Sequence, residues 1–300
     1  MKKKTYLFAL MAMVLTLGSC SDNENGIGGE TSKYITVSTS IGNMTRVATD
    51  AKGGQTFEEG DEISVYAWTG APTVAPETSE RVVNNAINKL TNGSWVSTPQ
   101  MLWKNNREKH YFIGVYPTAA ISDLSAGEYT FDVNKQTESD LLVAVNPDGL
   151  SYSADAQQTV PLTFTHVMAK LAVNLTYKNQ WGGIPTVEKV VVGNAAKEAT
   201  INYLTKVVTP STTAKEDFSL PEITENTKYV SVIIPQEDVK QLTIVIGGKN
   251  FVYDNGTPFK LESGKITTVN LEVGRDEIKL GDVKITNWED GSTFGGEALN

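Results

Sequence analysis

The stretch PLTFTHVMAKLAVNLTY (residues 161–177) carries the clearest signal for the fold. Apolar side chains recur at every second position in both of its halves, at Leu162, Phe164, Leu171 and Val173. An alternation of period two places such side chains on one face of a β-strand. The stretch therefore predicts a long span of extended chain with one face buried.

The same alternation recurs on both sides of this stretch. The other strand-like segments are residues 35–41, 63–67, 111–116, 141–145, 187–192, 229–234, 242–246, 251–253, 269–273 and 283–288. Turn chemistry separates several of them, as in NPDG at 146–149 and DNG at 254–256. Helical periodicity is rare, and only residues 79–90 and 236–240 suggest short helical turns. Many short strands with frequent turns predict an all-β fold built of sandwiches.

Length and composition favour two domains with real cores. The chain has 300 residues, of which 40% are hydrophobic. A polar segment with glycine and proline at 178–185 is the best boundary, giving domains at 34–180 and 181–300. The net charge is -9, and removal of residues 1–19 with their three lysines takes it to -9 - 3 = -12. An acidic chain repels phosphate backbones, so a nucleic-acid partner is disfavoured.

The N-terminus has the features of an exported lipoprotein. Lys2, Lys3 and Lys4 precede an apolar run at 6–17, which matches a signal peptide over residues 1–19. The run ends at LGSC, and Cys20, the single cysteine of the chain, stands where a lipid would be attached. The alternative is an ordinary cleaved signal with an incidental cysteine. Residues 20–33 then form a polar tether, which a lipid would anchor to the outer membrane.

Enzyme chemistry finds little support in the sequence. One cysteine and two histidines exclude an internal disulfide and a closed Cys/His zinc site, so no cofactor or metal is expected. The nucleophile elbow, the phosphate-binding loop and the zinc-protease helix motif are missing. His166 lies inside the strand pattern, where a hydrogen-bonded structural imidazole is expected. The carboxylates of residues 58–62 are expected in a solvated turn.

Several segments together resemble the fimbrillin-like family, the subunits of type V pili of gut and oral anaerobes. They occur in the family's order over nearly the whole chain and are FEEGDEISVYAW (57–68), WK (103–104), YFIGVYP (111–117), DLLVA (140–144), FTHVMAKL (164–171) and ITNW (285–288). Each segment alone is weak, and the set is specific. The resemblance implies two transthyretin-like β-sandwich domains in tandem.

The resemblance also implies a mode of assembly. Such subunits are exported as lipoproteins, and an arginine-specific protease then removes the first strand. Here that strand is residues 34–46, and Arg46 resembles the cleavage arginine. A strand of another subunit would fill the vacated groove by β-augmentation. Two C-terminal segments are candidate donors, one with Val269, Leu271 and Val273, the other with Val283, Ile285 and a terminal Trp288.

Two functions remain open from the sequence. The first is a structural subunit or tip adhesin of a surface pilus, with other pilin subunits, the protease and a host or bacterial surface ligand as partners. The glycine-rich tail at 291–300 is either a frayed terminus or the mark of a tip subunit that does not donate. The second is a glycan-binding lipoprotein that never polymerises, in which Trp68, Trp103 and Trp181 would stack on sugars. Both place the chain at the outer membrane or cell surface, the first in a fimbrium.

Overall fold

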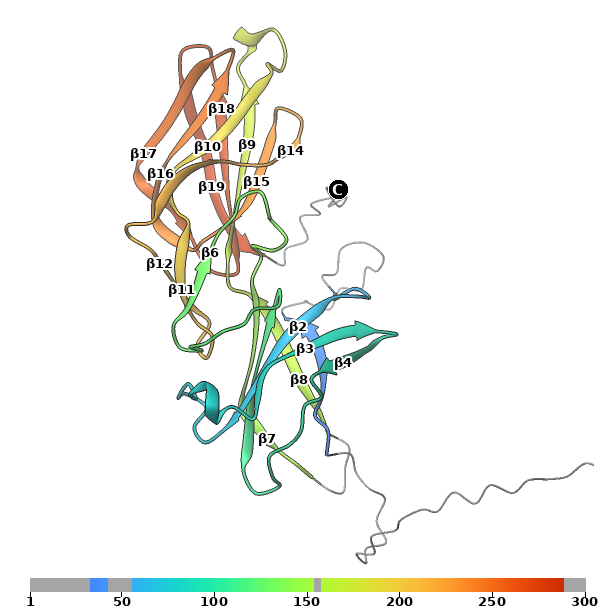
Figure 1. Cartoon of the computed structure of the whole chain (residues 1–300). Helices are drawn as coiled ribbons and strands as arrows, with labels where there is room; N and C mark the ends of the chain where they lie inside the picture. Colours follow the sequence, from blue (N-terminus) through green and yellow to red (C-terminus); the bar gives the residue numbers. More distant parts are fainter. Residues whose placement is uncertain (1–32, 43–55, 154–157, 289–300) are drawn as a thin grey trace, which may run out of the picture. The chain divides into compact units, whose positions relative to one another are not determined.

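The computed structural model describes residues 33–42, 56–153 and 158–288 (Figure 1). Within these residues the chain is all-β, with nineteen strands. Its two helical pieces are short 3-10 segments, η1 (Thr78–Glu80) and η2 (Asn179–Trp181). The all-β class expected from the alternation is confirmed, whereas a transthyretin-like topology for each half stays a prediction.

The N-terminal part forms one seven-stranded sheet. Its strands, in spatial order, are β1 (Thr36–Ile41), β8 (Thr159–His166), β7 (Leu142–Ser151), β5 (Lys109–Tyr116), β2 (Glu62–Thr69), β3 (Val83–Thr91) and β4 (Ser94–Thr98). Strand β2 is buried on both faces. Ile63 and Val65 belong to one apolar cluster, and Tyr66 and Trp68 to another. This explains why residues 63–68 are apolar almost throughout.

The seven-stranded sheet curls until its two outer strands are linked. The Trp95 Nε1 on β4 donates a hydrogen bond to Thr39 Oγ1 on β1 at 3.0 Å. The chain before β1 is joined to the segment after β4, because Ile35 N donates to Met101 O at 2.9 Å. The curled sheet encloses the smaller core cluster, which includes Phe112, Leu162 and Phe164.

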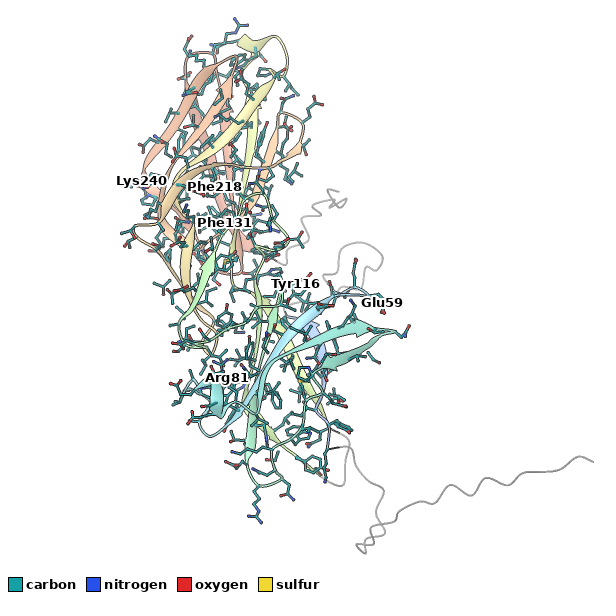
Figure 2. The ribbon with its side chains drawn as sticks, viewed as in Figure 1. Glu59, Arg81, Tyr116, Phe131, Phe218 and Lys240 are labelled. Carbon is teal, nitrogen blue, oxygen red and sulfur yellow. The ribbon has the colours of Figure 1, made fainter. Side chains whose placement is uncertain are left out.

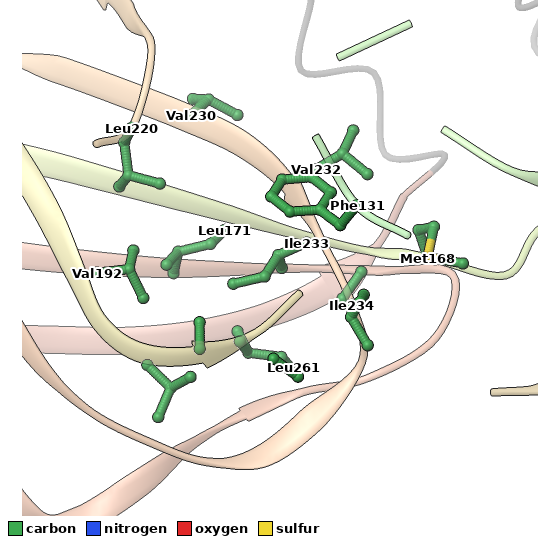
Figure 3. Close-up of a cluster of buried hydrophobic side chains, with 14 of the residues drawn as sticks. Phe131, Met168, Leu171, Val192, Leu220, Val230, Val232, Ile233, Ile234 and Leu261 are labelled. Atoms are coloured by element: carbon green, nitrogen blue, oxygen red, sulfur yellow. The ribbon is translucent and has the colours of Figure 1, made fainter. Parts of the chain in front are cut away.

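The C-terminal part is a sandwich of two larger sheets. One has the order β14 (Glu222–Thr224), β15 (Lys228–Ile233), β9 (Ala169–Tyr177), β18 (Lys265–Val273), β19 (Ile278–Asn287), and the other β13 (Lys215–Ser219), β10 (Val187–Ala196), β16 (Gln236–Ile246), β17 (Lys249–Leu261). Leu171 from the first sheet and Val192 and Leu261 from the second belong to one apolar cluster (Figure 3). Burial of these alternating side chains is the main stabilising term.

A three-stranded sheet joins segments that are far apart in sequence. β6 (Gly127–Thr130) pairs with β11 (Glu198–Asn202), which also pairs with β12 (Val207–Pro210). Directly after β6, Phe131 lies 5.2 Å from Phe218 between ring centroids (Figure 2). A segment from the first half of the chain thus contributes to the core of the second half.

The alternating span 161–177 is two strands rather than one. β8 ends at His166 and pairs with β7, whereas β9 begins at Ala169 and pairs with β15 and β18. Val167 and Met168 between them are buried, so the change of sheet leaves no polar signal in the sequence. The division at 180 between two domains stays a prediction, and the change of sheet lies ahead of it.

The two helical turns expected from spacing are wrong in most of their length. Residues 83–91 form β3, and residues 236–246 form β16. Both strands carry irregular pairing, and Asn85 in β3 has a φ of 55°. A bulge adds one residue to a strand, so Val83 and Ala86 are both buried although they are three apart. That spacing imitates the period of a helix.

Candidate strand-exchange site

Strand β1 lies between two different neighbours. It runs parallel to β8, with Val37 opposite Val160 and Ile41 opposite Phe164. On the other side, the residues just before β1 pair with residues 101–103, because Trp103 N donates to Lys33 O at 3.1 Å. Parallel pairs are slightly less stable per residue than antiparallel ones. Residues 33–41 therefore close a gap between β8 and residues 101–103, and β1 is held to β8 by the weaker kind of ladder.

Few side chains of β1 and its approach are fixed in the core. Ile35 and Val37 are buried, at 2% and 6% exposure. On the solvent side, hydroxyl groups pair at 3.2 Å between Thr36 and Thr159, and Ser40 donates to Thr163 at the same distance. The hydroxyl pairs define the register of this segment, whereas its two buried aliphatic side chains bury only a modest apolar area.

The two candidate donor segments occupy unlike positions. β18 lies between β9 and β19, and its Val269, Leu271 and Val273 are at most 1% exposed. β19 forms the end of its sheet and pairs only with β18 within the described residues. Its Val283 and Ile285 are 39% and 37% exposed. β18 is a central strand of the core, and β19 is an edge strand.

The side chains of β19 show why this edge is lightly held. Val283 lies opposite Val269, and Leu280 lies opposite Leu271, with a bulge between them. The bulge keeps the apolar side chains of both ends on the inner face. Asp282 accepts a hydrogen bond from Asn270 Nδ2 at 2.7 Å on the other face. An acidic group and a bulge on an edge strand are common protections against unwanted pairing.

The end of β19 is held by a cluster of polar and aromatic side chains, called the clamp below, made of Trp288, His166, Lys170 and Asp140. Trp288 stacks on His166 with 4.2 Å between ring centroids and an angle of 8° between the planes. The ammonium of Lys170 lies 4.1 Å from the centroid of the indole ring, and burial lowers the pKa of this lysine. His166 Nδ1 is 2.7 Å from Asp140 Oδ1, and Trp288 N donates to Gly264 O at 3.1 Å. The clamp joins the last described residue to the end of β8.

Two predicted site residues lie outside the described residues, namely Cys20 and Arg46. The glycine-rich tail at 291–300 lies outside them as well. Lipidation and cleavage therefore stay predictions.

The other histidine of the chain, His110, also has a structural partner. His110 is fully buried, and its Nε2 accepts a hydrogen bond from Lys104 N at 3.1 Å. Burial lowers the pKa of His110, which favours the neutral ring. In the described ranges 33–42, 56–153 and 158–288, no cluster of three His, Cys, Asp or Glu residues could hold a metal ion.

The tryptophans proposed as a sugar platform are largely covered. Trp68 is 2% exposed, Trp103 is 9% exposed, and Trp181 is half-buried with the guanidinium of Arg275 5.6 Å from its ring centroid. Stacking on a sugar needs an exposed ring face, and the first two tryptophans do not offer one. The glycan-binding alternative loses two of the three residues on which it rested, Trp68 and Trp103.

Several contacts of this site had no recognisable sequence signal. The sequence reasoning missed the pairing of residues 101–103 beside β1, the Trp95 contact with Thr39, and the place of Lys170 and Asp140 in the clamp. The closing segment ITNW was noticed only as a resemblance. Long-range side-chain contacts leave no local periodicity to read.

Comparison with known proteins identifies the family. The model of the fimbrillin-like family matches residues 45–288, and the chain belongs to that family. The match covers β2 through β19 and ends at Trp288. No curated protein sequence matches the chain significantly.

Solved structures share this fold at low identity. A protein described as a cell adhesion protein from Bacteroides uniformis is 18% identical with a TM-score of 0.61, covering 86% of this chain and all of that one. A second one, from Bacteroides ovatus, is 18% identical with a TM-score of 0.62, covering 85% and 98%. A fimbrial protein from Bacteroides vulgatus is 13% identical with a TM-score of 0.50, covering 75% and 92%. The family thus supports a fimbrial or adhesive role at the cell surface. Within the described residues, no helix is long and apolar enough to span a membrane.

Proposed function

We propose that this chain is a structural subunit or tip adhesin of a type V surface pilus, assembled by removal of β1 and donor-strand exchange. The observation that carries the proposal is the pairing of β1 and the residues just before it, which together fill a gap between β8 and residues 101–103. The family and the described fold both support a fimbrial role.

Cleavage after Arg46 would remove the whole of β1. Ile35 and Val37 would leave the core, and Trp95 would lose its hydrogen bond to Thr39. Backbone groups of β8 and of residues 101–103 would lose their partners on facing edges of one groove. An apolar groove between two unpaired edges favours binding of an extended strand with apolar side chains at alternate positions.

β19 fits the role of donor better than β18. Removing β18 would expose Val269 and Leu271 and separate β9 from β19, which would dismantle the sheet. Removing β19 breaks one antiparallel ladder and uncovers β18 along one edge. Its exposed Val283 and Ile285 would gain burial in the groove of another subunit.

The cellular setting follows from the same proposal. The precursor would be anchored in the outer membrane by a lipid on Cys20, and cleavage would release it for assembly with other pilin subunits into a fimbrium. A tip subunit would in addition hold a ligand on a host or bacterial surface. The protein acts through binding, and no catalysis is proposed.

Limited digestion with an arginine-specific protease, followed by mass analysis and a non-boiled gel, tests the proposal. A cut after Arg46 with a heat-sensitive ladder of multimers is expected. Arg81 is a built-in control, because it is 8% exposed and its guanidinium donates to Ile121 O at 2.6 Å. The Arg46→Ala variant should stay uncut at residue 46 and monomeric. Multimers formed equally well by that variant would refute the cleavage step.

A cut without multimers would restrict the chain to a tip role that needs another subunit. Mixing cut protein with a synthetic peptide of residues 276–290 distinguishes this outcome from a groove that cannot accept any strand. Binding of the peptide to cut but not to uncut protein is expected. If the cut protein binds no such peptide, β19 is not the donor.

A further inference from the structure

A groove of 760 Å³ opens beside the point where β1 begins. Its lining includes Leu102 and Trp103, the residues that pair with the chain just before β1, and Val74 from the loop after β2. Val74 is 61% exposed and Leu102 is 50% exposed. Two large aliphatic side chains are thus left half in water at the rim of a concave surface, an arrangement common at interfaces.

The direction of β1 determines which end of the strand groove adjoins this surface. Tyr34 bridges to Leu102 just before β1, and Ile41 at the other end pairs with Phe164. A donor strand that replaces β1 in the same direction therefore begins at Leu102. The body of the donor subunit must be near the beginning of its strand, since β19 follows the body in the chain.

The connection between the donor body and β19 is short. β18 ends at Val273 and β19 begins at Ile278, so four residues join them. Four extended residues span at most about 14 Å, at roughly 3.5 Å for each residue. The end of the donor body that carries this turn must therefore lie against the end of the groove at Leu102.

That end of the donor body carries an exposed apolar side chain of its own. The loop after β9 packs on the same turn, because Trp181 Nε1 donates to Val273 O at 2.9 Å and Arg275 N donates to Gln180 Oε1 at 3.1 Å. The loop continues through Gly182 and Gly183 to Ile184, which is 64% exposed.

We infer that the groove at Val74 and Leu102 receives the loop carrying Ile184 from a second copy of this chain. The inference rests on the proposed strand exchange. It adds a second contact between successive subunits, which does not involve the exchanged strand. Burial of three exposed aliphatic side chains would fix the angle between successive subunits. Because the two surfaces lie on different parts of the chain, the contact is head-to-tail and can be repeated along a filament.

Cysteine cross-linking of the full-length chain tests this contact. In a Cys20→Ser background, Leu102→Cys with Ile184→Cys should give disulfide-linked multimers on a boiled, non-reducing gel after cleavage. The matched control is Val96→Cys with Ile184→Cys, because Val96 is 54% exposed on β4 and does not line the groove. At least about tenfold more cross-linked product is expected from the first pair, because a disulfide forms only between closely placed Cα atoms.

The outcomes separate the two proposals. A heat-sensitive ladder with no excess of cross-linking at Leu102 would overturn the contact and leave strand exchange standing. A cut protein that forms no ladder and binds no β19 peptide would overturn both. The exposed single variant Ile184→Glu should fold normally and slow the growth of the ladder by about tenfold, because a charge would face an apolar groove. Unchanged growth of that variant would also contradict the contact.

Discussion

β18 and β19 are neighbours in one sheet and have similar sequence patterns, but they differ in pairing and in burial. Both alternate apolar and polar side chains over much of their length. β18 is paired on both sides and buries Val269 and Leu271 almost completely, whereas β19 is paired on one side with Val283 and Ile285 more than a third exposed. A strand can be exchanged only where its loss leaves the rest of the sheet intact.

The difference is one of free energy as well as position. A central strand contributes two ladders and a full set of core contacts, and an edge strand contributes one ladder and partial burial. The contacts of Trp288 with His166 and Lys170 additionally fix the end of the edge strand. β19 is thus held along its length by the ladder with β18 and at its two ends by the turn at 274–277 and by Trp288.

The largest effect on stability is expected when a buried side chain of β18 is shortened. Leu271→Ala should lower the free energy of unfolding by about 3 kcal/mol, because it leaves a cavity at a position that is 1% exposed. Chemical denaturation of the uncut protein measures this. A loss below about 1 kcal/mol, typical of exposed sites, would contradict the central position of β18.

The next largest loss of stability is expected at alkaline pH. Burial raises the pKa of Tyr116 and Tyr203 to about 12 and that of Tyr177 further. An unfolded tyrosine ionises near pH 10, so the folded chain binds more protons above that pH and stability falls as pH rises from about 10 to 12. Denaturation at pH 8, 10 and 11 tests this.

The alkaline prediction has a matched control. Tyr203→Phe removes one titrating group and should flatten the loss of stability above pH 10. β19 contains no tyrosine, so the free energy of its local opening, obtained from the protection factors of its amides, should change less with pH than global stability does. Equal pH dependence of wild type and variant would show that Tyr203 does not contribute.

A smaller and more local effect is expected at the clamp. Trp288→Ala should loosen β19 by about 2 kcal/mol, somewhat less than for a Trp in a core centre, because the residue lies at the end of an edge strand. Hydrogen exchange should speed up in β19 and stay unchanged in β18. Lys170→Met, which keeps the stem and removes the cation, should give part of the effect. Faster exchange in both strands alike would mean that Trp288 stabilises the whole sandwich.

The smallest effect on the stability of the monomer is expected at the exposed apolar residues of β19. Val283→Ser and Ile285→Ser should each cost less than about 1 kcal/mol in the uncut protein, because both side chains are already partly in water. Each should nevertheless reduce multimer formation after cleavage, since the groove requires apolar side chains. Thr286→Ser, on the other face of β19, is the control. If a variant that carries both substitutions forms multimers at wild-type yield, β19 is excluded as the donor.

Sequence reasoning predicted the strands better than their connections. The segments at 111–116 and 269–273 fall in strands, and the segment at 35–41 does so from residue 36 on, because alternation is a local property of each segment. The break at 167–168 was missed, since Val167 and Met168 are apolar and buried like the strands around them. Bulges at 83–91 and 236–246 shifted the spacing and gave false helical turns.

The sequence by itself determined the all-β class, the family and the apolar pattern of both candidate donors, because each is written in local alternation and short motifs. Which donor is free to leave was decided only by the tertiary structure. Val269 and Val283 are the same residue in similar patterns, yet one is fully buried and the other is 39% exposed. The physical reason is that burial depends on what lies across the sheet, and partners distant in the chain determine that.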